Sequence, residues 1–103
     1  MIFIETHIFT EDVKALLPDD EYRAFQGFLA DNPERGDVIQ NTGGLRKIRW
    51  GSHGKGKRGG VRVIYYYVKR SAQIRLLLIY QKGIKDDLTA AQKKQLQQLN
   101  EGW

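Results

Sequence analysis

The 103-residue sequence contains no cysteine, only two histidines and only two prolines. The absence of cysteine excludes disulfide bonds, thiolate-bound metals and iron–sulfur clusters, and it fits a reducing compartment. The two histidines, His7 and His53, are too far apart along the chain to form a metal-ligand motif. No apolar run approaches the roughly 20 residues of a membrane span, and the first residues lack the charged start of a signal peptide. We therefore expect a cytoplasmic protein with no membrane association, no metal and no cofactor.

Acidic residues are also scarce in one particular place. Nine of the twelve Asp and Glu precede residue 38, and the other three follow residue 85. The segment from Val38 to Lys85 holds twelve Lys and Arg and no acid, in a chain of net charge +5. Charge separated in this way concentrates phosphate groups near one surface. The alternative is a solvated basic face without a function.

The centre of the chain, residues 43–69, reads as two strands joined by a loop rich in glycine and cations. Alternation in the first strand, at residues 45–50, places three side chains on one face: Leu45, Lys47 and Arg49. The second strand, at residues 61–69, is dominated by β-branched and aromatic residues. Its shared face carries Arg62, Ile64, Tyr66 and Val68. The loop between the strands carries His53, Lys55, Lys57 and Arg58.

The flanking segments predict a short strand and two helices before this centre, and a strand and a helix after it. The expected ranges are Met1–Glu5, Glu11–Leu17 with Thr10 as cap, a helix capped by Asp19 or Asp20 that ends near Ala30, Gln73–Gln81, and Leu88–Asn100. The order β-α-α-β-β-β-α predicts one α+β domain over residues 1–103. In it, two N-terminal helices pack on a small antiparallel sheet that is followed by a C-terminal helix.

Finer expectations concern the last strand and its neighbours. Its nearly continuous apolar run predicts a strand covered on both faces, joined to the preceding one by a tight turn at Lys69–Ala72. Arg75 interrupts the run and is expected to point off an end. Val38 and Ile39 are expected to anchor the connection at residues 34–44. For the last helix, we expect Asp86 or Asp87 near its start and an apolar side of Leu88, Ala91, Gln95, Leu96, Leu99 and Trp103.

Several catalytic classes are excluded, because there is no cysteine nucleophile, no G-x-S-x-G elbow and no P-loop ending in G-K-[ST]. What remains is cations on neighbouring strands. Lys47 and Arg49 emerge about 6–7 Å apart on one face, Arg62 begins the next strand, and Lys82 follows the last. Such a cluster can bind RNA. It can also cleave RNA, since crowded lysines lower one another's pKa, so that one acts as base while an arginine holds the phosphate.

Two other aromatic or imidazole signals are weaker. Alternation makes at least one of Tyr65, Tyr66 and Tyr67 a core residue, so we favour packing over base stacking for these tyrosines. His53 is the one imidazole near the cations, and we favour a solvated loop residue over a general acid or base.

The run GDVIQNTGGLRKIRWGSHGKGKRGGVRVIYYY, followed by LLLIYQKGIKDDLTAAQKKQL, resembles the HigB-type toxins of the RelE/ParE superfamily. The resemblance covers residues 19–99 and is carried above all by GLRKIR and GKGKRGGVRVIYY. It implies a metal-independent endoribonuclease, an mRNA interferase that enters the A site of the 70S ribosome and cuts translated mRNA through 2′-hydroxyl attack. It also implies a cognate HigA-like helix-turn-helix antitoxin that neutralises the toxin. Operator DNA is then contacted only through the antitoxin complex.

The resemblance assigns residues by position. The implied catalytic residues are Lys47, Arg49, Arg62 and Lys82. The implied RNA-binding residues are His53, Lys55, Lys57, Arg58 and Lys85. RelE enzymes carry a second arginine and a tyrosine near the C-terminus, where this chain has residues 83–87, so the identity of the general acid stays open.

Two other functions remain as alternatives. A ParE-like toxin would use the same fold to poison DNA gyrase, and a non-catalytic module would bind RNA or the ribosome without chemistry. The three strand cations and the acid-free centre favour RNA as the target.

Overall fold

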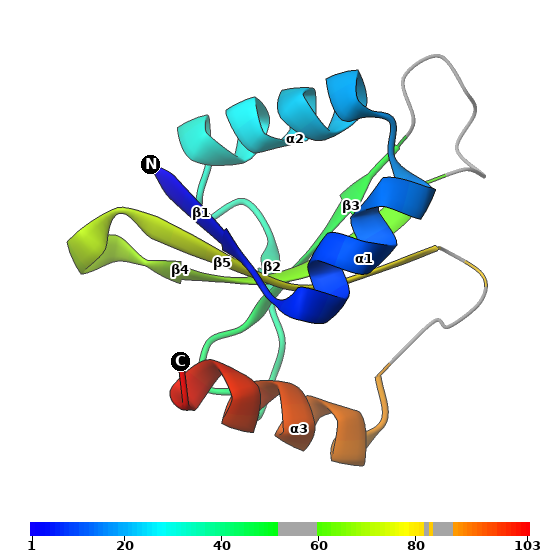
Figure 1. Ribbon diagram of the computed structural model, residues 1–103. Helices are drawn as coiled ribbons and strands as arrows, with labels where there is room; N and C mark the ends of the chain where they lie inside the picture. The colour runs from blue at the N-terminus through cyan, green and yellow to red at the C-terminus, as the bar shows by residue number, and fades with distance from the viewer. Residues whose placement is uncertain (52–59, 82, 84–87) are drawn as a thin grey trace.

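The computed structural model describes residues 1–51, 60–81, 83 and 88–103, and it shows an α+β fold built around one sheet (Figure 1). The strands are β1 (Ile2–Glu5), β2 (Asp37–Val38), β3 (Arg46–Trp50), β4 (Val61–Val68) and β5 (Gln73–Gln81), in the spatial order β1-β5-β4-β3-β2. The helices are α1 (His7–Leu16), α2 (Asp19–Asp31) and α3 (Ala90–Glu101). The predicted order is confirmed, with the short edge strand β2 added.

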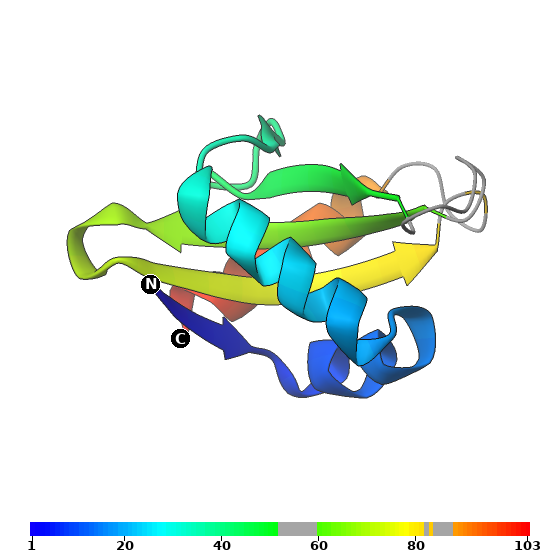
Figure 2. The ribbon, with the colours of Figure 1, turned by 90° about the horizontal axis from the view of Figure 1, so that it is seen from above.

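The sheet is mixed, whereas the sequence predicted an antiparallel one. Three of the neighbouring pairs are antiparallel, and β1 is parallel to β5. Helices α1 and α2 lie over one face and α3 lies under the other, so the sheet is the middle layer (Figures 1 and 2). The inner strand β5 is therefore covered on both faces, as its apolar run predicted.

Each face of the sheet has its own hydrophobic core. The larger core joins α1 and α2 to the sheet and consists of Phe9, Val13, Leu17, Phe25, Leu29, Ile48, Val61, Val63, Tyr65, Ile74, Leu76 and Ile79. The smaller core lies on the α3 side and consists of Leu45, Ile64, Leu77 and Leu88. Trp50 packs edge-on against Phe25, at 5.3 Å between ring centroids, on the larger-core side. The alternation read from the sequence in β3 and β4 is therefore confirmed.

The predicted helix caps were wrong at both N-terminal helices. α1 begins at His7, because the Thr6 hydroxyl accepts from Phe9 N at 3.0 Å. Thr10 lies inside the helix and donates instead to Glu5 Oε1 at 2.6 Å. At α2 the cap position is Pro18, so both aspartates occupy the first turn, where their charge suits the helix dipole.

The C-terminal helix also differs from expectation. α3 begins after Thr89, which forms a capping box with Gln92, while Asp86 and Asp87 lie outside the described residues. Leu88 is buried, but Leu99 and Trp103 remain 49% and 40% exposed, so the expected apolar side is covered only in part. Within the described ranges, no helix has the length and apolar character needed to cross a bilayer.

Two further expectations are corrected. Arg75 does not point off an end of the sheet, because its Nη1 donates to Asn100 O and Asn100 Oδ1 at 3.1 and 3.0 Å, under α3. Val38 is 55% exposed on the outermost strand, so its side chain is not an apolar anchor. Ile39 does pack against the smaller core.

Candidate functional site

Three predicted cations lie on the α3 side of the sheet, at the end opposite the β4–β5 turn. In β3, Lys47 and Arg49 share a face, and Arg49 is directly opposite Arg62 of β4. Lys47 is opposite Ile64 of the smaller core. Residues two apart on a strand are about 6–7 Å apart, and neighbouring strands are about 4.8 Å apart. The backbone thus places the Cα atoms of Lys47, Arg49 and Arg62 close enough for their side chains to reach one phosphate group or two neighbouring ones.

The pairing of Arg49 with Arg62 is electrostatically unfavourable in the isolated protein. Like charges directly opposite one another on a sheet are destabilising, by a few tenths of a kcal/mol up to about 1 kcal/mol. In addition, Nη1 of Arg62 is buried without a hydrogen-bond partner among the residues that the structure describes. Buried polar groups normally have a partner, and an anionic oxygen bound between the two guanidinium groups would relieve both costs.

The other predicted site residues cannot be placed. Lys82 and Lys85, and the loop residues His53, Lys55, Lys57 and Arg58, lie outside the described part of the chain. Their assignments as catalytic or RNA-binding residues remain predictions. In the described segments no group of three or more His, Asp or Glu side chains gathers as metal ligands would.

One neighbour of the cations was missed in the sequence. Tyr80 of β5 lies directly opposite Arg62, so Arg49, Arg62 and Tyr80 form a row across three neighbouring strands. The hydroxyl of Tyr80 is buried, and its side chain packs against the smaller core. Alternation alone could not find Tyr80, because the pairing depends on a bulge in β5.

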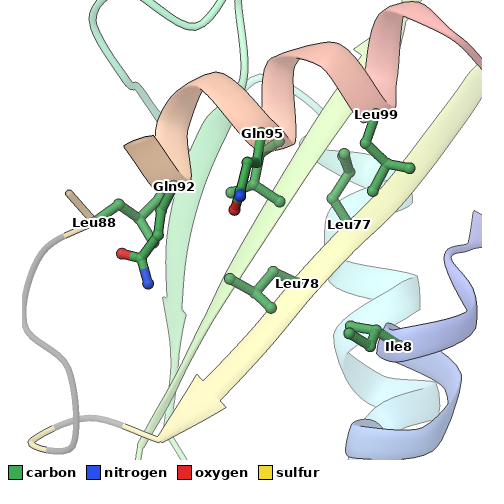
Figure 3. A pocket seen from close by; sticks show the side chains of 8 residues that line it. Ile8, Leu77, Leu78, Leu88, Gln92, Gln95 and Leu99 are labelled. Carbon is green, nitrogen blue, oxygen red and sulfur yellow. The ribbon is translucent and has the colours of Figure 1, made fainter. Parts of the chain in front are cut away.

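An apolar groove lies on the same side of the molecule, between α3 and β5 (Figure 3). Its volume is about 290 Å³. It is lined by Ile8, Leu77, Leu78, Leu88, Gln92, Gln95, Leu96 and Leu99. With glutamine as its only polar lining, this groove offers no charge for a phosphate and no acid or base, so it does not compete with the cationic end of the sheet as a chemical site.

Comparison with known proteins identifies the fold through a solved structure and not through a sequence family. No protein-family model matches the sequence. The fold is that of the RelE-like toxins. Among solved structures, the chain is similar to toxin RelE of E. coli, in a doubly arginine-substituted form in the free state, with a TM-score of 0.58 and 11% sequence identity. The match covers 82% of this chain and 86% of the RelE chain. At this identity the likeness shows the fold alone, and it confirms the fold class predicted from the sequence.

Proposed function

We propose that this protein is the toxin of a type II toxin–antitoxin system and acts as an endoribonuclease on translated mRNA. The observation that carries the proposal is the opposed pair Arg49 and Arg62, with Lys47 beside it. Among the described residues, the buried Nη1 of Arg62 has no hydrogen-bond partner. A fold shared with a solved structure of toxin RelE supports the same class. Finer features, namely the HigB type and dependence on the 70S ribosome, follow from the sequence resemblance.

The proposed reaction is an internal transfer at one phosphodiester. The ribose 2′-oxygen forms a bond to phosphorus as the bond to the 5′-oxygen breaks, leaving a 2′,3′-cyclic phosphate and a 5′-hydroxyl. Lys47 acts as the general base that takes the proton of the 2′-hydroxyl. Arg49 and Arg62 bind the non-bridging oxygens, on which negative charge grows in the transition state. The proton for the 5′-oxygen comes from Lys82 or Lys85, and no metal takes part.

The proposed partners follow from this activity. His53, Lys55, Lys57, Arg58 and Lys85 contact mRNA or ribosomal RNA next to the cleaved bond. A HigA-like antitoxin neutralises the toxin, and the toxin reaches operator DNA only as part of that complex. The site of action is the cytoplasm, where the ribosome presents mRNA in its A site. In this proposal, residues 1–103 form a single catalytic domain.

The test is induced expression in bacteria of the wild type and of Arg62→Ala, with mapping of mRNA 5′ ends. We expect growth arrest with new 5′ ends inside reading frames for the wild type. Loss of one transition-state donor lowers the rate by about 10²–10³-fold, so Arg62→Ala should abolish both effects. Arg70→Ala is the matched control, because Arg70 is exposed in the turn at the opposite end of β4 and should leave arrest and cleavage unchanged.

A comparison of the wild type with Arg62→Ala also distinguishes RNA binding from RNA cleavage. One lost phosphate contact changes the salt slope of single-strand binding by only about 0.7, so Arg62→Ala should retain RNA binding. Arrest without new 5′ ends would refute the nuclease and favour gyrase poisoning. A wild type that causes no arrest but binds RNA would favour a non-catalytic module.

A further inference from the structure

A bulge in β5 decides which residue meets Arg62. From Val68 to Tyr65 the β4 residues pair in step with β5, ending with Tyr65 opposite Leu76. The next pair is Ile64 with Leu78, so Leu77 is an extra residue on β5. Without this residue Arg62 would lie opposite Ile79, but the bulge moves Tyr80 there and leaves Ile79 in the larger core. Bulges commonly re-aim side chains next to functional sites.

The bulge is held in place by specific contacts. The carbonyl of Leu77 accepts from the Thr6 hydroxyl at 2.9 Å, and the carbonyl of Leu76 accepts from Thr6 N at 3.0 Å. The side chains of Leu77 and Leu78 both point toward α3, where they line the apolar groove (Figure 3). The bulge is therefore held by Thr6 at the β1 edge of β5, and by Leu77 and Leu78 on the face that α3 covers.

Arg62 lies between a like charge and an aromatic side chain. Arg49 is its partner on the β3 side and Tyr80 is its partner on the β5 side. Like charges at directly opposite positions repel, which favours an Arg62 guanidinium turned toward β5. Tyr80 packs against the smaller core on that side. Its ring would therefore limit how far the guanidinium turns away from Arg49, beside which two arginines can share one phosphate.

We propose that Tyr80 is a positioning residue of the RNA-cleaving site, and that its ring holds the Arg62 guanidinium beside Arg49. The role rests on the proposed function. Tyr80 lies directly opposite Arg62, and its ring acts on the RNA only through Arg62.

The test is steady-state cleavage of mRNA on programmed ribosomes by purified full-length variants. Tyr80→Phe keeps the ring, and we expect kcat and KM within threefold of the wild type. Tyr80→Leu removes the ring, and we expect kcat at least tenfold lower with KM changed less than threefold, since the other cations still bind RNA. Tyr80→Met also removes the ring but leaves a long, flexible side chain, and we expect the same loss of kcat. It replaces Tyr80→Leu in the test if the leucine variant does not fold.

The matched control is Leu96→Ala on α3, where the leucine is half-buried against the same smaller core but lies outside the sheet. It perturbs the packing of that core without changing β5 and should keep kcat within threefold. Equal losses of kcat in Leu96→Ala and Tyr80→Leu, a loss in Tyr80→Phe, or a fully active Tyr80→Leu would each overturn the proposal. If the wild type cleaves mRNA and Arg62→Ala does not, the proposed function stands. The outcomes above then refute only the positioning role of Tyr80.

A second readout does not depend on cleavage. The Nε–H resonance of Arg62, assigned by its loss in Arg62→Lys, should shift in Tyr80→Leu and stay in place in Leu96→Ala and Tyr80→Phe. An unchanged resonance in Tyr80→Leu would contradict the positioning role even in a protein that cuts no RNA. A shifted resonance in an inactive wild type would support the positioning of Arg62 while refuting the proposed function.

Discussion

At the scale of single residues, Gly36 links the connection before β2 to Tyr65 of β4. Its N–H donates to the Tyr65 hydroxyl at 2.9 Å, and that hydroxyl donates to Pro33 O at 2.9 Å. Tyr65 is fully buried, so these two bonds satisfy its hydroxyl within the protein. A Cβ added at Gly36 would lie 2.9 Å from the Tyr65 ring and hydroxyl and 3.1 Å from Lys47 O.

Gly36→Ala is therefore expected to lower the free energy of unfolding by about 1–3 kcal/mol, as overpacking of a tight core does. The measurement is urea denaturation followed by circular dichroism. Gly27→Ala is the matched control, because Gly27 lies in the middle of α2 with no atom near its added Cβ. That change should stabilise the protein by about 0.5–1 kcal/mol. Equal effects of the two changes would show that Gly36 is not closely packed.

Alternation along the strands predicted which residues share a face but not which residues meet across strands. The period of two placed Lys47 and Arg49 together and set Arg62 on the face of Ile64, as observed. The partner of Arg62 could not be predicted, because the bulge at Leu77 is fixed by Thr6, a residue 71 positions away. Contacts set by tertiary structure leave no local pattern in the sequence.

At the scale of elements, α3 is attached to the sheet chiefly at its two ends. Leu88 is buried at its start and Asn100 is buried at its end. Nη1 of Arg75 donates to both the backbone and side-chain oxygens of Asn100. The guanidinium also lies 5.4 Å from the ring centroid of Trp103 and 5.7 Å from that of Tyr66. Arg75 thus fastens the last turn of α3, which the sequence alone did not suggest.

Arg75→Ala should destabilise the protein by about 1.5–3 kcal/mol, the range for hydrogen bonds to a charged group. Amide hydrogen exchange should rise most in the last turn of α3, because the lost bonds are there. Arg70→Ala removes an exposed arginine of the neighbouring turn and should change neither quantity. Unchanged exchange at the end of α3 in Arg75→Ala would show that the helix is held by its apolar contacts alone.

The ends of the helices were harder to predict than their existence. The sequence predicted all three helices, and in α2 Phe25 and Leu29 are buried. The cap of α1 depended on which of two threonines precedes the helix, and the cap position of α2 is Pro18, which makes no side-chain cap bond. Thr6 rather than Thr10 caps α1, because the chain leaves β1 at Thr6, which also forms hydrogen bonds to β5.

At the scale of the whole molecule, the side of the sheet covered by α1 and α2 depends on neutral tyrosines. The Tyr22 hydroxyl of α2 donates to Glu5 Oε2 of β1, and Tyr65 bonds to the connection after α2. Burial raises the pKa of both phenols above the usual value, and for Tyr22 the bond to Glu5 raises it further. Both phenols are neutral in the folded protein at a pH where they would ionise in the unfolded chain.

Raised folded-state pKa values make the protein less stable in alkali. Below about pH 10, the ordinary pKa of tyrosine, both states hold the phenol protons and the full stability is present. Above that pH the unfolded chain releases the protons first, so the free energy of unfolding falls, by up to about 1.4 kcal/mol per pH unit for each tyrosine. We expect urea denaturation between pH 7 and pH 11 to show this fall.

The two tyrosines can be separated from the lysines, which titrate in the same range. Tyr22→Phe and Tyr65→Phe should each be less stable than the wild type at pH 7, because a hydrogen bond is lost. Each should also lose less stability between pH 10 and pH 11, since one ionising phenol is gone while the lysines are unchanged. The double variant should show the shallowest decline. A decline of equal slope in all four proteins would assign the alkaline instability to the lysines and not to these phenols.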